Sequence, residues 1–350
     1  LAQRATARQG KAPDNTLGAH LEVAAHYGVD MVSLERDDQV RLCYSGEAFR
    51  RVLALRASDV QKALAALALT RHDCVAPTLT PVERFSLDNW RADVLDRINS
   101  VQLPDVLKNR LHLRRAGVWA SLAWQRARRP EFGPAAVAQA ATRALSELAA
   151  INKSELAESD AAAYSDAALR VGASRWAAEP GVPVAPLKAA GGLAITTRSG
   201  QPGETCIDLV QAGNGAQPPL FTRCTYGTVW PASAAVHPQG MAVTVAVQPL
   251  DTWRELWVFR RSAAGWTVDV IPPANDQPNL GYIEFAGWVP GSSQMLAARE
   301  TKLNGRYRTS FELINLSTLA VERSADRPAS LSAFHRWQSP LWKAQTVSLR

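Results

Sequence analysis

A change of hydrophobic pattern near residue 180 constrains the fold most. In residues 17–178 apolar side chains recur every three or four residues, which indicates amphipathic helices. Beyond residue 192 they alternate with a period of two, and seven of the eleven tryptophans lie there, which indicates strands. Residues 179–192 hold three prolines and three glycines and predict a linker.

We therefore expect a multidomain α and β chain. The prediction is a flexible arm at residues 1–16, an all-α helical-hairpin domain at residues 17–178, the linker at 179–192, and an all-β propeller-like or sandwich domain at residues 193–350. Within the first domain, residues 31–44 suggest a small β-hairpin. Ser86 is predicted to cap one helix, Pro104 to begin the next, and Pro130 to end it.

Cys43 and Cys74 bracket a predicted pair of helices. Residues 58–61 have the S-x-x-Q form of a capping box, and the connection before them is short, so the two helices should fold back antiparallel. This arrangement brings both cysteines to the same end. We therefore predict a disulfide between Cys43 and Cys74 that staples the open end of the hairpin.

Cys206 and Cys224 lie in two predicted strands joined by a loop rich in glycine and proline. If Val210 opposes Leu220 across this hairpin, the same register places Cys206 opposite Cys224. Two local pairs predict disulfides and an extracytoplasmic location, periplasmic or secreted. The alternative is four buried free cysteines that pack as small apolar residues. The absence of a C-x2-C spacing or Cys/His cluster predicts no metal site, and no cofactor is expected.

Composition limits the class of partner. The chain has 350 residues, of which 47% are hydrophobic and 20% charged, which is typical of a globular protein. Its net charge of +7 is spread over both halves, whereas a nucleic-acid binder usually concentrates its charge, so no nucleic-acid partner is expected. No apolar run approaches the roughly 18 residues of a membrane-spanning helix, so no transmembrane segment is expected.

The second half contains an internal repeat. Residues 235–247 align with residues 287–299 at an offset of 52, which places Pro238 on Pro290 and, without a gap, Phe259 on Phe311. Each copy reads as four strands joined by short turns, the length of one propeller blade. Residues 334–350 start like a third copy. Residues 193–230 are expected to supply strands before the first copy.

These repeats resemble WD40-type or TolB-like β-propellers, which implies blades that bind through variable loops. The Trp-Asp dipeptide of WD repeats is absent, and about three blades are visible where a closed propeller needs four or more. We therefore expect an open array, a domain completed by another chain or segment, or a sandwich. The resemblance transfers no site residue.

Catalytic signatures are not found: the sequence has no G-x-S-x-G elbow, phosphate-binding loop or H-E-x-x-H motif, so no catalytic residue is predicted. The densest charge feature is a run of basic residues without an acidic one, which predicts a site for an anionic partner or, alternatively, a solvated face paired with acidic residues. The run comprises Lys108, Arg110, Arg114, Arg115, Arg126, Arg128 and Arg129.

The function expected from these features is non-enzymatic. We expect an extracytoplasmic binding or scaffold protein whose helical and propeller-like surfaces meet a protein partner or an anionic envelope component. The alternative is a hydrolase or lyase that acts on an envelope polysaccharide or peptide, with a site assembled only in the fold.

Overall fold

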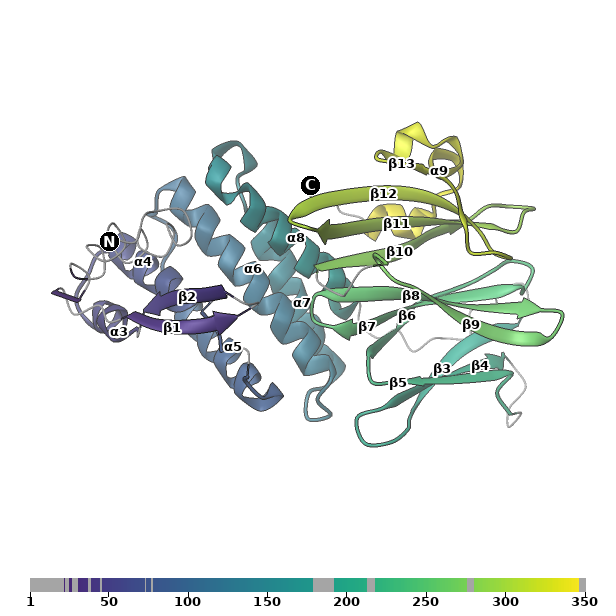
Figure 1. Ribbon diagram of the computed structural model, residues 1–350, viewed down its shortest axis with the longest axis horizontal. Coiled ribbons are helices and arrows are strands. Elements are labelled where there is room, and N and C mark those ends of the chain that lie inside the picture. The colour runs from purple at the N-terminus through teal and green to yellow at the C-terminus, as the bar shows by residue number, and fades with distance from the viewer. Residues whose placement is uncertain are drawn as a thin grey trace. The chain divides into compact units, whose positions relative to one another are not determined.

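The computed structural model describes residues 22, 25–26, 31–36, 39–44, 46–72, 74–76, 78–178, 192–212, 218–275 and 280–345. Helices dominate its N-terminal part and strands its C-terminal part, as expected (Figure 1). Packing divides the chain into two compact units, residues 1–118 with 150–161, and residues 119–149 with 162–350. The predicted domain boundaries stay predictions, and the arm at 1–16 and residues 179–191 of the linker lie outside the described residues.

The first unit begins with the small hairpin expected from the sequence, β1 (Met31–Arg36) and β2 (Gln39–Tyr44), paired antiparallel. The helices α3 (Glu47–Ala54) and α4 (Asp59–Leu69) follow. Ser58 caps α4 through a capping box with Gln61, as predicted. The Cys43–Cys74 disulfide joins β2 to the segment after α4, with the two Cα atoms 5.6 Å apart.

The next helices correct one predicted start. In α5 (Pro81–Asp96), the capping box is formed by Thr80 and Glu83, with Pro81 in the first turn, so Ser86 lies inside the helix. The prediction missed this because Thr80 and Glu83 bracket a proline that also favours a helix start. The helix α6 (Asp105–Ala127) begins directly after Pro104 and ends before Pro130. Short 3-10 turns η1 (Lys153–Glu155) and η2 (Glu158–Asp160) close this unit.

In the second unit, helices lie against strands. The end of α6 is followed by α7 (Pro134–Ala149), α8 (Ala161–Ser174) and the 3-10 turn η3 (Arg175–Ala178). Alanine-rich faces allow α7 to approach the strands closely: Ala140 and Ala141 share a buried cluster with Ala123, Trp230 and Ala246.

The described strands of this unit form three antiparallel groups, each a meander in chain order. The first layer is a three-stranded sheet of β3, β4 and β5. The second layer contains β6 to β9 and the third β10 to β13, and a short parallel contact between β8 and β10 joins these two into one eight-stranded sheet. Their bounds are β3 (Leu193–Ser199), β4 (Thr205–Gln211), β5 (Phe221–Thr225), β6 (Thr228–Val236), β7 (Ala242–Leu250), β8 (Trp253–Ser262), β9 (Gly265–Ile271), β10 (Leu280–Trp288), β11 (Gln294–Leu303), β12 (Arg306–Asn315) and β13 (Val321–Ala325).

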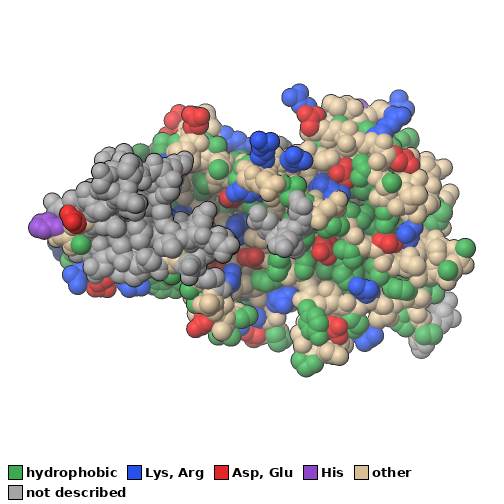
Figure 2. Space-filling model, in the orientation of Figure 1, with side chains coloured by type: hydrophobic (Ala, Val, Ile, Leu, Met, Phe, Trp, Pro, Cys, Tyr) green, Lys and Arg blue, Asp and Glu red, His purple; other side chains and the backbone are tan. Residues whose placement is uncertain are grey.

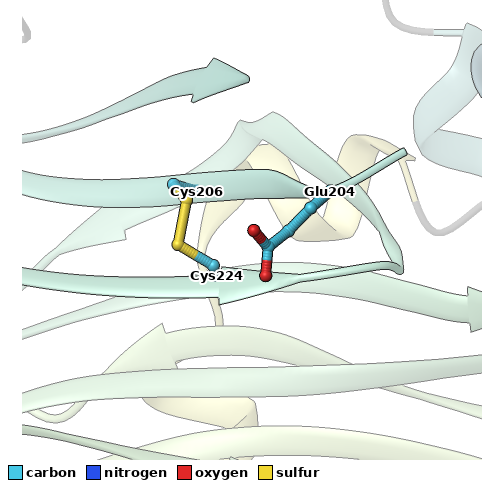
Figure 3. Close-up of side chains that lie close together, drawn as sticks. All are labelled: Glu204, Cys206 and Cys224. Carbon is cyan, nitrogen blue, oxygen red and sulfur yellow. A yellow bond between two sulfur atoms is a disulfide. The ribbon is translucent and has the colours of Figure 1, made fainter. Parts of the chain in front are cut away.

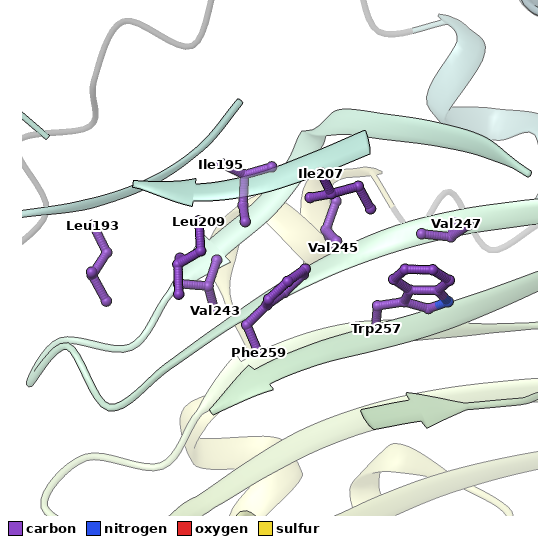
Figure 4. Packing of buried hydrophobic residues seen from close by; sticks show 9 residues of the cluster. All are labelled: Leu193, Ile195, Ile207, Leu209, Val243, Val245, Val247, Trp257 and Phe259. Carbon is purple, nitrogen blue, oxygen red and sulfur yellow. The ribbon is translucent and has the colours of Figure 1, made fainter. Parts of the chain in front are cut away.

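The three layers stack face to face (Figure 1). Side chains of β3 and β4, such as Ile195 and Leu209, pack on Val245 and Phe259 of the second layer (Figure 4). The opposite face of the second layer packs on the third through residues that include Val258 and Ile283. Burial of these faces is the main force that holds the layers together.

The predicted four-strand repeat is confirmed, with one correction to its alignment. Phe259 faces the first layer, whereas Phe311 packs on Phe334 at the outer face of the third layer. The third strands begin at Trp253 and Arg306, an offset of 53 rather than 52. One extra residue reverses which side chains face which layer, because strand side chains alternate. An ungapped alignment could not detect it.

The predicted third copy at residues 334–350 is wrong where the structure describes it. These residues belong to α9 (Ser332–Trp337) and α10 (Pro340–Gln345), preceded by the turn η4 (Pro328–Ser330). Phe334 and Trp342 bury their rings against the outer face of the third layer. Among the described strands no sheet closes on itself, and the propeller resemblance stays a prediction.

Candidate functional site: a groove along an open sheet edge

Both predicted cysteine pairs are joined. Cys206 and Cys224 are directly opposite in the β4–β5 ladder, in the predicted register. The Glu204 carboxylate lies beside the two sulfur atoms (Figure 3), and it accepts a hydrogen bond from the Gln201 amide at 3.0 Å. A carboxylate and two cysteines are a possible metal-ligand set, but the sulfurs are bonded to each other and supply no thiolate.

The predicted basic run is divided between the two units, and all seven side chains contact other parts of the protein. Arg114 donates to the Leu67 carbonyl at the end of α4, and Arg115 donates to the Leu95 and Ile98 carbonyls at the end of α5. Cations at these positions satisfy free carbonyls and complement the helix dipoles. Lys108 pairs with Asp105 at 3.4 Å and Arg110 with Asp160 at 2.7 Å.

The other three arginines of the run contact the second unit's own residues. Arg126 lies over the rings of Trp119 and Phe132, and Arg128 lies over Trp124 and donates to the Tyr226 carbonyl. Arg129 pairs with Glu131 at 3.3 Å. On the face shown in Figure 2, basic side chains are interspersed with acidic ones. An anionic ligand would have to displace these contacts, and its binding by this run stays a prediction.

A buried ion cluster connects the second and third layers. Glu284 of β10 accepts hydrogen bonds from Arg175 and, at 2.6 Å, from the fully buried Arg254 of β8; the Trp342 indole also donates to it at 2.9 Å. Burial alone would raise the pKa of Glu284, but the two guanidinium charges lower it overall. Arg254 also donates to the Gly172 and Ala173 carbonyls at the end of α8. Every one of these contacts positions an element, so the cluster is structural.

A mainly apolar groove of about 500 Å³ lies in the second unit. Phe132, Trp176 and Trp230 supply aromatic surface, and Pro134 and Pro231 add rigid apolar surface. None of the residues that line the groove is charged. Pockets of this size and lining are typical of binding sites.

One side of the groove is the open edge of β3, which contributes Ile195, Thr196 and Thr197. The Gly200 amide donates to the Glu204 carbonyl, and the Ala212 amide donates to the Gly192 carbonyl, so the even-numbered residues of β3 exchange hydrogen bonds with β4. By the alternation of antiparallel ladders, the amides and carbonyls of Ile195 and Thr197 point away from β4. In the described part of the chain no strand pairs with this edge.

The other side of the groove is β6, where pairing with β7 is irregular between Trp230 and Ala235. The Ser233 hydroxyl bridges the gap: it donates to the Trp230 carbonyl at 2.6 Å and accepts from the Ala246 amide at 2.7 Å. Pro231 lies in this segment and has no N–H. The edge of β6 is therefore protected against pairing, whereas that of β3 is not.

Sequence reasoning missed the residues of this groove because they come from distant segments: the α6–α7 connection, η3, β3 and β6. One signal was present in the pattern. Three described strands, β3 to β5, precede the first complete four-strand copy, so the described part of the first layer is one strand short of the other two.

No family model, curated protein or solved structure that was compared with the chain matches it. Among the described helices, none is both long and apolar enough to cross a membrane.

Proposed function

We propose that this is a non-enzymatic binding protein of the periplasm or the extracellular space that holds a segment of a protein partner in the groove. The observation that supports the proposal best is the cluster of Phe132, Trp176 and Trp230 along an open strand edge. Aromatic side chains dominate the energetics of protein interfaces, and an unpaired edge offers backbone hydrogen bonds to an extended peptide.

The two disulfides support the location. Both close local hairpins, with sequence separations of 31 and 18 residues, and such bonds persist in oxidising compartments. In this proposal the propeller-like stack of layers is a rigid scaffold, and the groove is its binding surface. A hydrolase or lyase would need carboxylates or histidines aimed into the site, and the residues that line this groove include neither.

The proposal is tested by selection of random dodecapeptides displayed on phage against the immobilised protein. Trp176→Ala and Thr196→Arg provide two counter-selections, since one removes aromatic surface and the other places a charge at an exposed position of the lining. We expect peptides with apolar residues at alternate positions, and each substitution should weaken their binding by about tenfold or more.

A matched control is Thr222→Arg, an exposed threonine on β5 that does not line the groove. It removes the hydrogen bond that Thr222 donates to Asp208, but it should change peptide affinity by less than about twofold. Peptides that bind all three variants equally, or a selection with no enriched sequence, would contradict the proposal.

A further inference from the structure

Among the described residues, the first layer lacks the strand that begins each of the other layers. The second layer runs β6–β7–β8–β9 and the third β10–β11–β12–β13, each paired in that order. The first layer leads into the second from β5, just as the second leads into the third from β9. By this correspondence β5 is a fourth strand, β4 a third and β3 a second, so the missing strand is the first.

The missing strand has a defined place. In the complete layers the first strand pairs antiparallel with the second, as β6 does with β7 and β10 with β11. The same place in the first layer is the open edge of β3, where the amides and carbonyls of Ile195 and Thr197 point outward. The groove lies along this edge, so space, apolar surface and unpaired backbone groups coincide.

The preceding sequence is poorly suited to supply the strand. The repeat offset of 52 places the equivalent of β6 at residues 176–184, and the first three of these belong to η3 (Arg175–Ala178). Pro180 and Pro183 follow at a spacing of three, so in a strand one of the two would face β3 and could not donate a hydrogen bond.

We propose that an extended segment of the partner protein adds to β3 as the first strand of this layer. This inference rests on the proposed function and specifies its partner: a strand of alternating apolar residues, antiparallel to β3, without proline at the positions that face it. Its backbone pairs with Ile195 and Thr197, and its apolar side chains cover the lining around Trp176 and Trp230.

The probe is a fluorescein-labelled synthetic peptide of residues 280–288, LGYIEFAGW, because this sequence is the first strand of the third layer. Binding is measured by fluorescence anisotropy on the full chain. Thr197→Pro removes one outward amide but leaves the ladder to β4 intact, and Thr197→Val is the matched control that keeps the amide. We expect Thr197→Pro to weaken binding by about tenfold or more and Thr197→Val by less than about twofold.

Two modified peptides test the pairing independently of any protein variant. N-methylation at alternate residues removes the N–H groups along one edge of the peptide, and N-methylation at the intervening residues removes those along the other. In strand addition only one edge faces β3, so one peptide should lose binding and the other should keep it.

Each outcome has one meaning. Failure of the unmodified peptide to bind overturns the inference. This would be the result if residues 179–191 or a second copy of the chain occupied the edge. Equal binding by Thr197→Pro and Thr197→Val, or by the two methylated peptides, also overturns it. If Trp176→Ala weakens binding but these backbone changes do not, the groove function stands and strand addition fails. If the backbone changes act and Trp176→Ala does not, strand addition stands and the aromatic groove fails.

Discussion

The first and second layers are successive meanders of the same chain, packed face to face, yet they differ at the edge where each layer begins. The second layer has four strands, and the outer edge of its first strand, β6, is protected because the strand is irregular and contains Pro231. The first layer has three described strands and an unprotected edge. Natural sheets usually protect or cover such edges. The proposed function accounts for this difference, because it gives the β3 edge a partner strand.

The layers also differ in what stabilises them. The second and third are linked through Arg254 and Glu284, both buried, whereas the first depends on its apolar core and the Cys206–Cys224 disulfide. Substitutions that separate these contributions show which of them each layer needs.

Glu284→Gln should have the largest effect. It leaves the charges of Arg175 and Arg254 buried without their carboxylate, and loss of one partner of a buried ion pair typically destabilises by about 3–5 kcal/mol. Urea unfolding measures the change in the free energy of unfolding. Glu322→Gln on the exposed strand β13 is the control and should change it by less than about 0.5 kcal/mol.

The same carboxylate sets a pH dependence. Because the pKa of Glu284 is lowered in the folded protein, its contribution is complete above the ordinary value of 4.5 and is lost as the pH falls through the lower folded-state value. The wild-type protein should therefore lose more stability below pH 4.5 than Glu284→Gln does. Identical acid unfolding of the two proteins would contradict an ionised Glu284 carboxylate in the folded protein.

Removal of the disulfide by Cys206→Ala with Cys224→Ala should destabilise by about 3 kcal/mol, because the bond closes a loop of 18 residues. Hydrogen exchange should increase first in β3, β4 and β5. The matched double variant at Cys43 and Cys74 removes the disulfide of the other unit and should spare these strands. Equal loss of protection in the second and third layers would show that the first layer is not a separate stability element.

Gly172→Ala should destabilise by about 1–2 kcal/mol. An added Cβ would clash with Cε1 of Tyr282, so the Tyr282 ring, α8 or β10 must shift. The cost of this shift outweighs the helix propensity that alanine gains over glycine. In a Tyr282→Ala background the clash is absent, and Gly172→Ala should then stabilise by up to about 1 kcal/mol. Thermal unfolding of the four proteins checks the change of sign.

The smallest effect concerns His237 in the turn between β6 and β7. Its Nδ1 accepts a hydrogen bond from the Gln239 amide, and its ring contacts Trp288 edge-on. Burial lowers the pKa of His237, and a hydrogen bond with the Ser292 backbone, which raises it, offsets this only in part. The folded state therefore favours the neutral ring, and stability should fall as the pH drops below about 6.5. His237→Asn should reduce this slope between about pH 7.5 and 5.5, and an unchanged slope would assign it to another group.

Local features were predictable from the sequence where one interaction dominates. The Ser58 capping box, the β1–β2 hairpin and the Cys206–Cys224 register all depend on residues close in sequence, and all are confirmed. Competing local signals caused the errors. Thr80 caps α5 in place of Ser86 because Pro81, which follows it, favours a helix start. The aromatic residues near Phe334 have the pattern of a strand, but they lie in helices that cover a sheet face.

The groove could not be predicted because its parts converge only in three dimensions. Phe132, Trp176, Ile195 and Trp230 are up to about a hundred positions apart, and neither periodicity nor motif spacing relates them. The basic run shows the converse. Its charge density was visible, but the helix ends that Arg114 and Arg115 bind are set by tertiary packing.

Whether the β3 edge is open can be measured by amide hydrogen exchange at single residues of β3 in the free protein. The backbone amides of Ala194 and Thr196 donate to β4, whereas those of Ile195 and Thr197 point away from it. We predict that the latter two amides exchange at least about a hundredfold faster than the former two. Equal protection of all four amides in the free, monomeric protein would show that the edge is already paired, and would contradict its role as a docking site for a partner strand.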